Sequence, residues 1–452
     1  MAASKLTFNF LLLNFLASLL IPEISLCDHS RQPKRDVVMF LFGDSIFDAG
    51  NNNYINNISV SYRANYWPYG ETFFHFPTGR FTDGRLILDF IDFFSSSNGC
   101  LHVQQQRSVY RSFPHSYNLV LISLMEFASA GAGVFPVANP EVISLRMQLS
   151  NFKNVAISME EQIGDKEAKK LLRQAVYATC VGANDYSYFV DNYPNATQLE
   201  QDEFVNSMVG NLTAFVKVIS IKFLINSSVR ACIKGIVQFR IKEKFAILNV
   251  GPRGCQPAAR QSKELRGDEC DEVSMEMIKK HNSAASKAIK ELESKLSGFK
   301  YSIVDFYTIL LDMIKHPKDY GKYTDFDNIR VLVRMQSKPR IILPTVCVSF
   351  LFSISSLLFV LGRLQGIKIS CCGHGMYNAA HCGIEPYTLC KNPSEYLFFD
   401  GWHPTEHGYR ILADLFWNGK PSIAAPYNLR QLFDLESTPI ISSEEYEVPH
   451  DE

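Results

Sequence analysis

Ser45 lies in a short polar turn that directly follows an apolar run at residues 37–42. A serine placed there is held by rigid backbone with its hydroxyl at the edge of a sheet, and Gly43 permits the tight turn. This setting suits a nucleophile, although the turn is not the G-x-S-x-G elbow of the α/β-hydrolases. The alternative is a turn of Asp, Ser and Asn that caps the next helix. On this stretch alone, the cap is the simpler interpretation.

Asp400 and His403 stand three residues apart in a polar segment near the end of the chain. At this spacing the carboxylate can hold the Nδ1–H of the imidazole, which leaves Nε2 free as a general base. The alternative is a surface loop that precedes a helix starting at Pro404. A single D-x-x-H pattern is weak evidence for either.

Two further turns offer donors for an oxyanion. Asn184 follows an apolar run at residues 175–181, and its side-chain amide can stabilise developing negative charge. The small-residue loop at 127–133 can present backbone N–H groups in the same way. The alternatives are an Asx turn at Asn184 and a close packing turn at 127–133.

Apolar runs of strand length alternate with helical patterns, such as the one at residues 272–296, and predict the elements that position these side chains. The runs are 37–42, 175–181, 244–250 and 301–306. Continuous apolar strands that alternate with helices indicate a parallel sheet covered on both faces. In such sheets functional side chains gather beyond the carboxyl ends of the strands.

Composition sets the class of protein. The chain has 452 residues, of which 46% are hydrophobic and 20% charged, as is typical of a folded globular protein. Its net charge of −1 gives no electrostatic footprint for nucleic acid. It also argues against charge-driven binding to anionic membranes.

The first 27 residues have the pattern of a signal peptide. Lys5 precedes an apolar stretch at 6–21, and small residues follow at 25–27. The alternative is an N-terminal membrane anchor. Glycosylation sequons support export, and they begin at Asn57, Asn195, Asn211 and Asn226. We therefore expect a secreted protein, located outside the cell or in the cell wall.

The cysteines admit two interpretations. In an exported chain disulfides are favoured, whereas the dense Cys and His residues at 371–390 also suggest zinc. The spacing fits no standard zinc pair, so we expect disulfides and no metal. The set expected to form them, with the pairing open, is Cys255, Cys270, Cys371, Cys372, Cys382 and Cys390.

Together the motifs and their order are far more specific than any one of them. They read FGDSIFDAGNNN, PTGRFTDGR, FASAGAG, GANDY, KFAILNVGPRGCQP, CCGHGMYN and FDGWHPTEHGY. In this order the chain resembles the plant GDSL-type esterase/lipase family within the SGNH hydrolases. The resemblance extends from residue 37 to about 415.

The resemblance implies a fold and a role for each site residue. The fold is a flavodoxin-like three-layer α/β/α arrangement with a central, mainly parallel sheet. Ser45 is similar to the family's nucleophile, His403 to its general base and Asp400 to the carboxylate that orients the base. The N–H of Gly131, the side chain of Asn184 and the N–H of Ser45 match the oxyanion donors.

The implied activity is that of a secreted serine esterase. It hydrolyses carboxylic esters, lipid or other acyl esters, through an acyl-enzyme on Ser45, and it needs no organic cofactor or metal. We expect a monomer whose partner is a small-molecule or lipid ester.

Three windows depart from the family pattern within the single domain expected at 28–452. They are residues 95–124, 219–242 and 330–369, and Glu126 also stands where an Asn commonly precedes FAS. We interpret some of these windows as translated intron or splice-variant sequence. Two alternatives to the esterase stay open. One is a catalytically impaired variant with at most a binding role, and the other is a cell-wall polysaccharide deacetylase or acyltransferase.

Residues 341–362 contain no charged side chain and are long enough to span a bilayer. One crossing there would place Asp400 and His403 on the opposite side of the membrane from Ser45. A triad needs contacts of about 3 Å, whereas the hydrocarbon layer is about 30 Å thick. We therefore expect no stable membrane span in the active form.

Overall fold

The structure, a computed structural model, describes residues 38–95, 107–108, 124–232, 243–267, 269–320 and 366–435. The signal-peptide prediction at 1–27 and the apolar segment at 341–362 lie outside these residues. So do most of the windows 95–124 and 330–369 and residues 233–242 of the window 219–242, whose earlier part lies in a helix. The interpretation of these windows stays a prediction.

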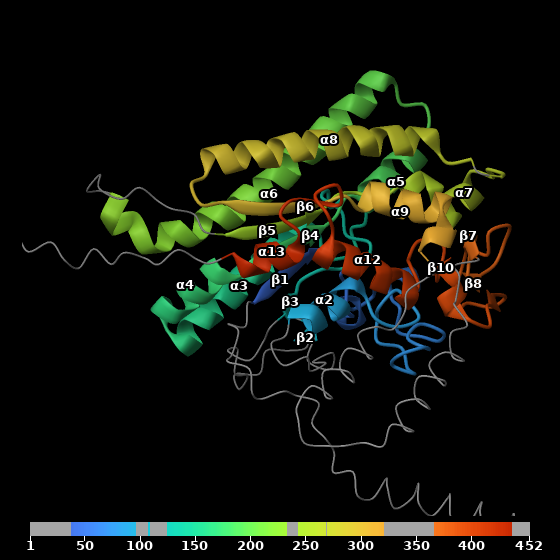
Figure 1. The fold of residues 1–452 in the computed structure, drawn as a ribbon, viewed down its shortest axis with the longest axis horizontal. Coiled ribbons are helices and arrows are strands. Elements are labelled where there is room, and N and C mark those ends of the chain that lie inside the picture. The colour runs from blue at the N-terminus through green and yellow to red at the C-terminus, as the bar shows by residue number, and fades with distance from the viewer. Residues whose placement is uncertain are drawn as a thin grey trace, which may run out of the picture.

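A seven-stranded sheet forms the centre of the protein (Figure 1). Its strands are paired in the order β11 (Ala424–Pro426), β6 (Lys300–Val304), β5 (Lys244–Leu248), β4 (Val176–Cys180), β1 (Met39–Gly43), β3 (Leu124–Glu126) and β2 (Arg107–Ser108). All neighbours are parallel except β11, which runs antiparallel to β6. The sheet is therefore mainly parallel, as predicted.

Side chains of β1 alternate between two apolar cores. Phe40 and Phe42 point into one core, whereas Met39 and Leu41 point into the other. Because both faces of a parallel sheet are covered, its strands read as continuous apolar runs rather than as alternating ones. This explains why the continuous apolar run at 37–42 predicted a buried strand.

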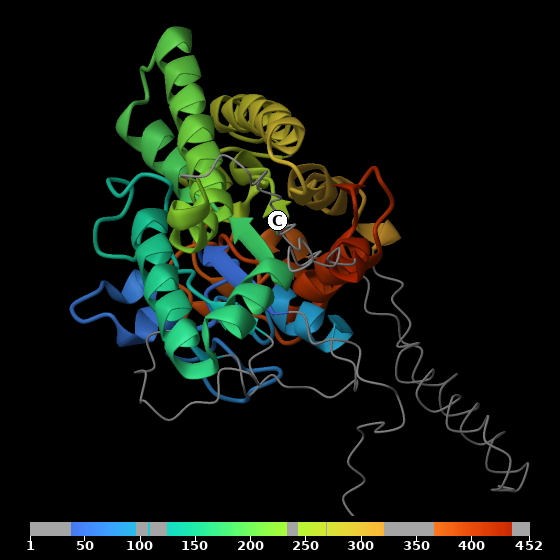
Figure 2. The same ribbon diagram turned by 90° about the vertical axis from the view of Figure 1, so that its left-hand side faces the viewer.

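Helices cover both faces of the sheet (Figure 2). The first core is closed by α3 (Leu145–Ile163), α4 (Asp165–Gln174), α5 (Ala183–Asn192), α6 (Gln198–Cys232) and α8 (Glu272–Lys295). The second is closed by α2 (Ile87–Ser95), α9 (Phe306–Lys315), α12 (Glu406–Asn418) and α13 (Leu429–Asp434). The predicted three-layer α/β/α architecture is confirmed.

Four predicted strands and one predicted helix have their expected places. The runs at 175–181 and 244–250 contain β4 and β5, and the runs at 37–42 and 301–306 contain most of β1 and most of β6. The helical pattern at 272–296 is α8, which ends at Lys295. The short strands β2, β3 and β11 have two or three residues each and were not predicted.

Short strands and disulfides organise the chain between residues 366 and 398. β7 (Gly366–Ser370) pairs with β10 (Tyr396–Phe398), and β8 (Cys372–Gly373) pairs with β9 (Thr388–Leu389). The six cysteines expected to form disulfides do so, as Cys255–Cys270, Cys371–Cys390 and Cys372–Cys382. Their sulfurs are therefore not thiolate ligands for zinc.

None of the helices within the described ranges is both long enough and apolar enough to cross a bilayer.

Candidate active site

Ser45 follows the end of β1 in a turn that its neighbours hold rigid. A side chain at Gly43 would meet the carbonyl oxygen of Cys180 at 2.1 Å, and Gly43 has φ +149°, so this position requires glycine. The side chain of Gln148 binds both backbone groups of Gly43, at 2.8 Å each. Asp44 is buried, and its Oδ1 accepts a 3.1 Å hydrogen bond from the N–H of Ile46. The half-buried hydroxyl of Ser45 is thus fixed at the sheet edge.

Asp400 and His403 come from the loop between β10 and α12. Oδ1 of Asp400 accepts hydrogen bonds of 2.8 Å from the backbone N–H groups of Trp402 and His403. The side chain of Thr405 caps α12 by accepting from the N–H of Gly408. Both side chains of the D-x-x-H pattern therefore project from one short, hydrogen-bonded segment.

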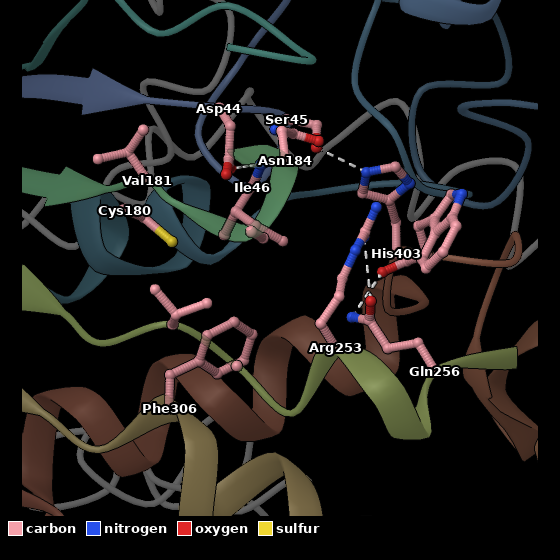
Figure 3. Close-up of a pocket in the computed structure, with 14 residues that line it drawn as sticks. Asp44, Ser45, Ile46, Cys180, Val181, Asn184, Arg253, Gln256, Phe306 and His403 are labelled. Carbon is pink, nitrogen blue, oxygen red and sulfur yellow. Dashed lines mark hydrogen bonds between the residues drawn. The ribbon is translucent and has the colours of Figure 1, made fainter. Parts of the chain in front are cut away.

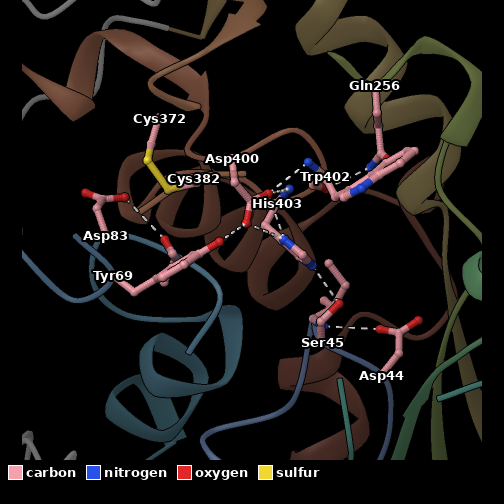
Figure 4. A network of polar contacts seen from close by, with 12 residues as sticks. Asp44, Ser45, Tyr69, Asp83, Gln256, Cys372, Cys382, Asp400, Trp402 and His403 are labelled. Carbon is pink, nitrogen blue, oxygen red and sulfur yellow. Dashed lines mark hydrogen bonds and ion pairs between the residues drawn. A yellow bond between two sulfur atoms is a disulfide. The ribbon is translucent and has the colours of Figure 1, made fainter. Parts of the chain in front are cut away.

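These segments meet in a continuous chain of hydrogen bonds (Figure 4). Nδ1 of His403 lies 2.8 Å from Oδ1 of Asp400, and its Nε2 lies 2.7 Å from Oγ of Ser45. Ser45 and His403 are 358 residues apart in the sequence. With Nδ1 protonated, His403 donates to Asp400 and accepts from Ser45, which is the arrangement of a nucleophile and its base.

The environment of Asp400 keeps it ionised. Burial alone would raise the pKa of this carboxyl, but the positive charge of His403 and the hydrogen bonds from His403, Trp402 and Tyr69 lower it below the ordinary value. A carboxylate stabilised in this way can hold the imidazole and stabilise its protonated form.

Tyr69 is a member of this network that sequence reasoning missed. It is buried, and its hydroxyl donates a 2.9 Å hydrogen bond to Oδ2 of Asp400. Its ring packs edge-on against Phe81 and Phe399, and Phe81 also contacts the ring of His403 at a centroid distance of 4.8 Å. Tyr69 stands in irregular chain with no periodic pattern, so the sequence carries no signal for this contact.

The three predicted oxyanion donors all keep a hydrogen for a further hydrogen bond. Asn184 lies in the first turn of α5, and its Nδ2 donates one hydrogen to the carbonyl of Ala132 at 2.9 Å, which leaves the second hydrogen. Within the described part of the chain, the N–H groups of Ser45 and Gly131 donate no hydrogen bond. Gly131 has φ +82°, and a side chain there would meet the ring of Tyr62 at 2.7 Å.

A pocket opens beside the serine (Figure 3). Its apolar wall includes Val181, Val250 and Phe306. Ser45, Asn184 and His403 also line it, together with the polar residues Asp44, Arg253 and Gln256 and the ring of Trp402. Gly131 is not among the residues that line this pocket, so its role stays a prediction.

Glu126 and Asp48 are two buried acidic residues whose charges act on each other. Its carboxyl accepts hydrogen bonds from the side chain of Asn51 at 2.9 Å and from the N–H of Ala49 at 3.3 Å. Burial and the nearby charge of Asp48 raise the pKa of Glu126 well above its ordinary value. Burial also raises the pKa of Asp48, to about 6.

Three of the four predicted glycosylation sites have exposed side chains: Asn57, Asn195 and Asn211. Asn226 lies in α6, and its side chain is outside the described part of the chain.

The chain matches the family described as GDSL-like Lipase/Acylhydrolase over residues 39–416. It is 32% identical to GDSL esterase/lipase 4 of Arabidopsis thaliana, and the alignment covers 94% of this chain and 98% of that protein. It is 33% identical to GDSL esterase/lipase 1 of the same plant, with 92% and 95% covered. It is also 33% identical to GDSL esterase/lipase 2, with 88% and 89% covered.

Proposed function

Because the chain belongs to the GDSL-like lipase and acylhydrolase family, whose members are hydrolases that act on ester bonds, we propose that it cleaves carboxylic esters through an acyl-enzyme on Ser45. The observation that carries this proposal is the continuous contact from Ser45 through His403 to Asp400. The apolar wall of the pocket supports an acyl or other hydrocarbon group beside the serine.

Acylation begins with proton transfer. Nε2 of His403 accepts the hydroxyl proton of Ser45 while Oγ forms a bond to the ester carbonyl carbon. The carbonyl oxygen gains negative charge, which the side chain of Asn184 and the N–H groups of Ser45 and Gly131 stabilise. The bond to the alcohol oxygen then breaks, His403 gives its proton to that oxygen, and the alcohol leaves.

Deacylation repeats these steps with water. His403 takes a proton from a water molecule whose oxygen bonds to the acyl carbon on Ser45. The bond between that carbon and Oγ breaks, and the proton on His403 returns to Oγ. The carboxylic acid is released and the enzyme regains its starting state.

The test is hydrolysis of 4-nitrophenyl butyrate by the purified protein, with labelling of Ser45 by a fluorophosphonate probe. Ser45→Ala removes the nucleophile, so we expect loss of both turnover and labelling. Ser61→Ala is the matched control, because Ser61 is exposed. Full turnover by the Ser45→Ala protein, or no turnover by the native sequence, would contradict the proposal.

We also infer that the protein is secreted. The three disulfides among the described residues and the exposed side chains of Asn57, Asn195 and Asn211 support an oxidising, glycosylating compartment. Expression in a eukaryotic secretory host should yield a protein in the medium whose mass falls on treatment with an N-glycosidase. A protein retained inside the cell without glycans would contradict secretion.

The contact between Ser45 and His403 also bears on residues 341–362. Both side chains must lie on one side of any membrane to approach within 2.7 Å. We therefore expect that a glycosylation sequon added at the C-terminus will be modified in the same host. A C-terminus that is unmodified and open to protease from the cytosol would contradict the esterase mechanism for this chain.

A further inference from the structure

Arg253 places a positive charge in the pocket that contains the catalytic serine and histidine. It stands in the short helix η5 (Arg253–Cys255), which follows β5, and its side chain reaches towards His403 (Figure 3). No step of the proposed ester hydrolysis uses this guanidinium. Its setting therefore calls for a separate explanation.

Neutral groups hold the guanidinium in one orientation. Nε donates to Oγ of Ser187 at 2.7 Å, and Nη1 donates to Oε1 of Gln256 at 3.1 Å. Its central carbon lies 3.5 Å from the centroid of the Trp402 ring. These contacts fix the side chain without cancelling its charge. Within the described part of the chain, Nη2 donates no hydrogen bond, so the Nη1–Nη2 edge retains hydrogens for a ligand.

The acidic groups around Arg253 have other partners. Asp191 pairs with Lys263 at 3.4 Å, and Asp400 binds His403. Asp44 is only 2% exposed, and its Oδ1 accepts from the N–H of Ile46. Among the described residues, no carboxylate lies within ion-pair distance of Arg253. Burial lowers the pKa of Arg253 to about 10, although the charges of Asp44, Asp191 and Asp400 act in the opposite direction from beyond ion-pair distance, so the guanidinium is still charged at neutral pH. The side chain is half-buried and has no ion-pair partner among the described residues, so an anionic ligand in the pocket would pair a charge that the protein leaves unpaired.

We propose that Arg253 binds a carboxylate carried by the substrate in addition to the ester that is cleaved. The Nη1–Nη2 edge offers parallel N–H groups that match one planar carboxylate. The described lining of the pocket contains no second arginine and no lysine, which favours a carboxylate over the more highly charged phosphate. The apolar wall at Val181, Val250 and Phe306 fits the hydrocarbon part of such an ester. This inference rests on the proposed ester hydrolysis.

A different role is that Arg253 supports the catalytic loop. It stacks on Trp402, and Gln256 donates to the carbonyl of Trp402 at 3.1 Å. A support of this kind would lower the rate for every ester by the same factor. A carboxylate site would instead change the preference between a charged ester and its neutral counterpart.

Two substrates that differ by one charge separate these roles. Mono-4-nitrophenyl adipate has a free carboxylate, whereas methyl 4-nitrophenyl adipate carries a methyl ester in its place. We expect the native sequence to prefer the charged ester in kcat/KM, and we expect Arg253→Met to reduce the ratio of the two by about tenfold or more. Arg253→Lys should retain part of the preference. Lys263→Met is the matched control, because it removes a nearby charge outside the pocket.

An equal ratio in the native sequence and in Arg253→Met would overturn the proposal. Binding provides a readout that does not depend on turnover. In the Ser45→Ala background, monomethyl adipate should bind about tenfold more tightly than it does after Arg253→Met is added, as measured by calorimetry. Equal affinities would also overturn the proposal. Loss of turnover of both esters by the native sequence, with this binding difference intact, would instead contradict only the ester hydrolysis.

Discussion

The hydroxyl of Tyr69 donates a 2.9 Å hydrogen bond to Oδ2 of Asp400, although 331 residues separate the two in the sequence. Oδ1 of the same carboxylate is occupied by the N–H groups of Trp402 and His403, and both oxygens face Nδ1 of His403. Tyr69 therefore completes the set of donors that fixes the carboxylate. We regard it as a positioning residue, because it acts on the reaction through Asp400.

Tyr69→Phe should lower kcat by about tenfold, which corresponds to about 1.4 kcal/mol, and should leave KM within about twofold. The ring contacts with Phe81 and Phe399 stay, and only the hydroxyl is lost. The measurement is steady-state hydrolysis of 4-nitrophenyl butyrate. An unchanged kcat would contradict a positioning role.

Tyr409→Phe is the matched control for this substitution. Tyr409 is fully buried in α12, and its hydroxyl has no hydrogen-bond partner within the described part of the chain. Removing an unsatisfied buried hydroxyl should raise the free energy of unfolding by about 1 kcal/mol. Urea denaturation should therefore show a gain in stability for Tyr409→Phe and no gain for Tyr69→Phe.

Asn184→Ala should lower kcat by about 100- to 1,000-fold, because the transition state loses one oxyanion donor. The substrate carbonyl carries less charge in the ground state, so KM should change little. Asn192→Ala is the control, since Asn192 stands in the same helix, α5, and is exposed. A kcat within twofold of the native value would remove Asn184 from the proposed mechanism.

The disulfide Cys255–Cys270 closes a loop with a sequence separation of 15 residues, which begins two residues after Arg253. Replacing both cysteines with alanine should lower the free energy of unfolding by about 3 kcal/mol, because the unfolded chain gains freedom. Thermal unfolding under non-reducing conditions measures this change. If the variant and the native sequence unfold at the same temperature, the disulfide does not contribute to stability.

Much of the sheet could be predicted because its central strands are buried on both faces. The apolar runs of β1, β4, β5 and β6 carry this signal, whereas β2, β3 and β11 are too short for any period to show. The segments that contain Ser45, Asn184 and His403 could be found from their polar side chains after strands or before a helix. No such signal marks Tyr69 or Arg253.

These two side chains take part in the site through contacts made across the fold. Tyr69 meets Asp400 across 331 residues, and Arg253 in η5 meets Trp402 in the loop before α12. Neither contact follows from local spacing. The six disulfide cysteines could be named as a set from the sequence, but they could not be paired. Six cysteines allow 15 pairings, and only the three-dimensional arrangement selects one.

Glu126 should make stability fall as pH rises. Burial raises its pKa well above the value of 4.5 that the free group has. Above pH 4.5 the unfolded chain loses this proton while the folded chain keeps it, so ionisation favours unfolding. The stability that the protonated form provides is complete below pH 4.5 and is lost as pH rises towards the folded pKa.

Glu126→Gln replaces this carboxyl with a neutral side chain of similar shape that does not titrate. Relative to the native sequence, the variant should therefore gain free energy of unfolding between pH 5 and pH 8, by at most about 1.4 kcal/mol per pH unit. Urea denaturation at several pH values measures the difference, and Glu161→Gln on the exposed side of α3 is the control. A difference that stays constant with pH, or that shrinks as pH rises, would show that Glu126 is ionised in the folded protein.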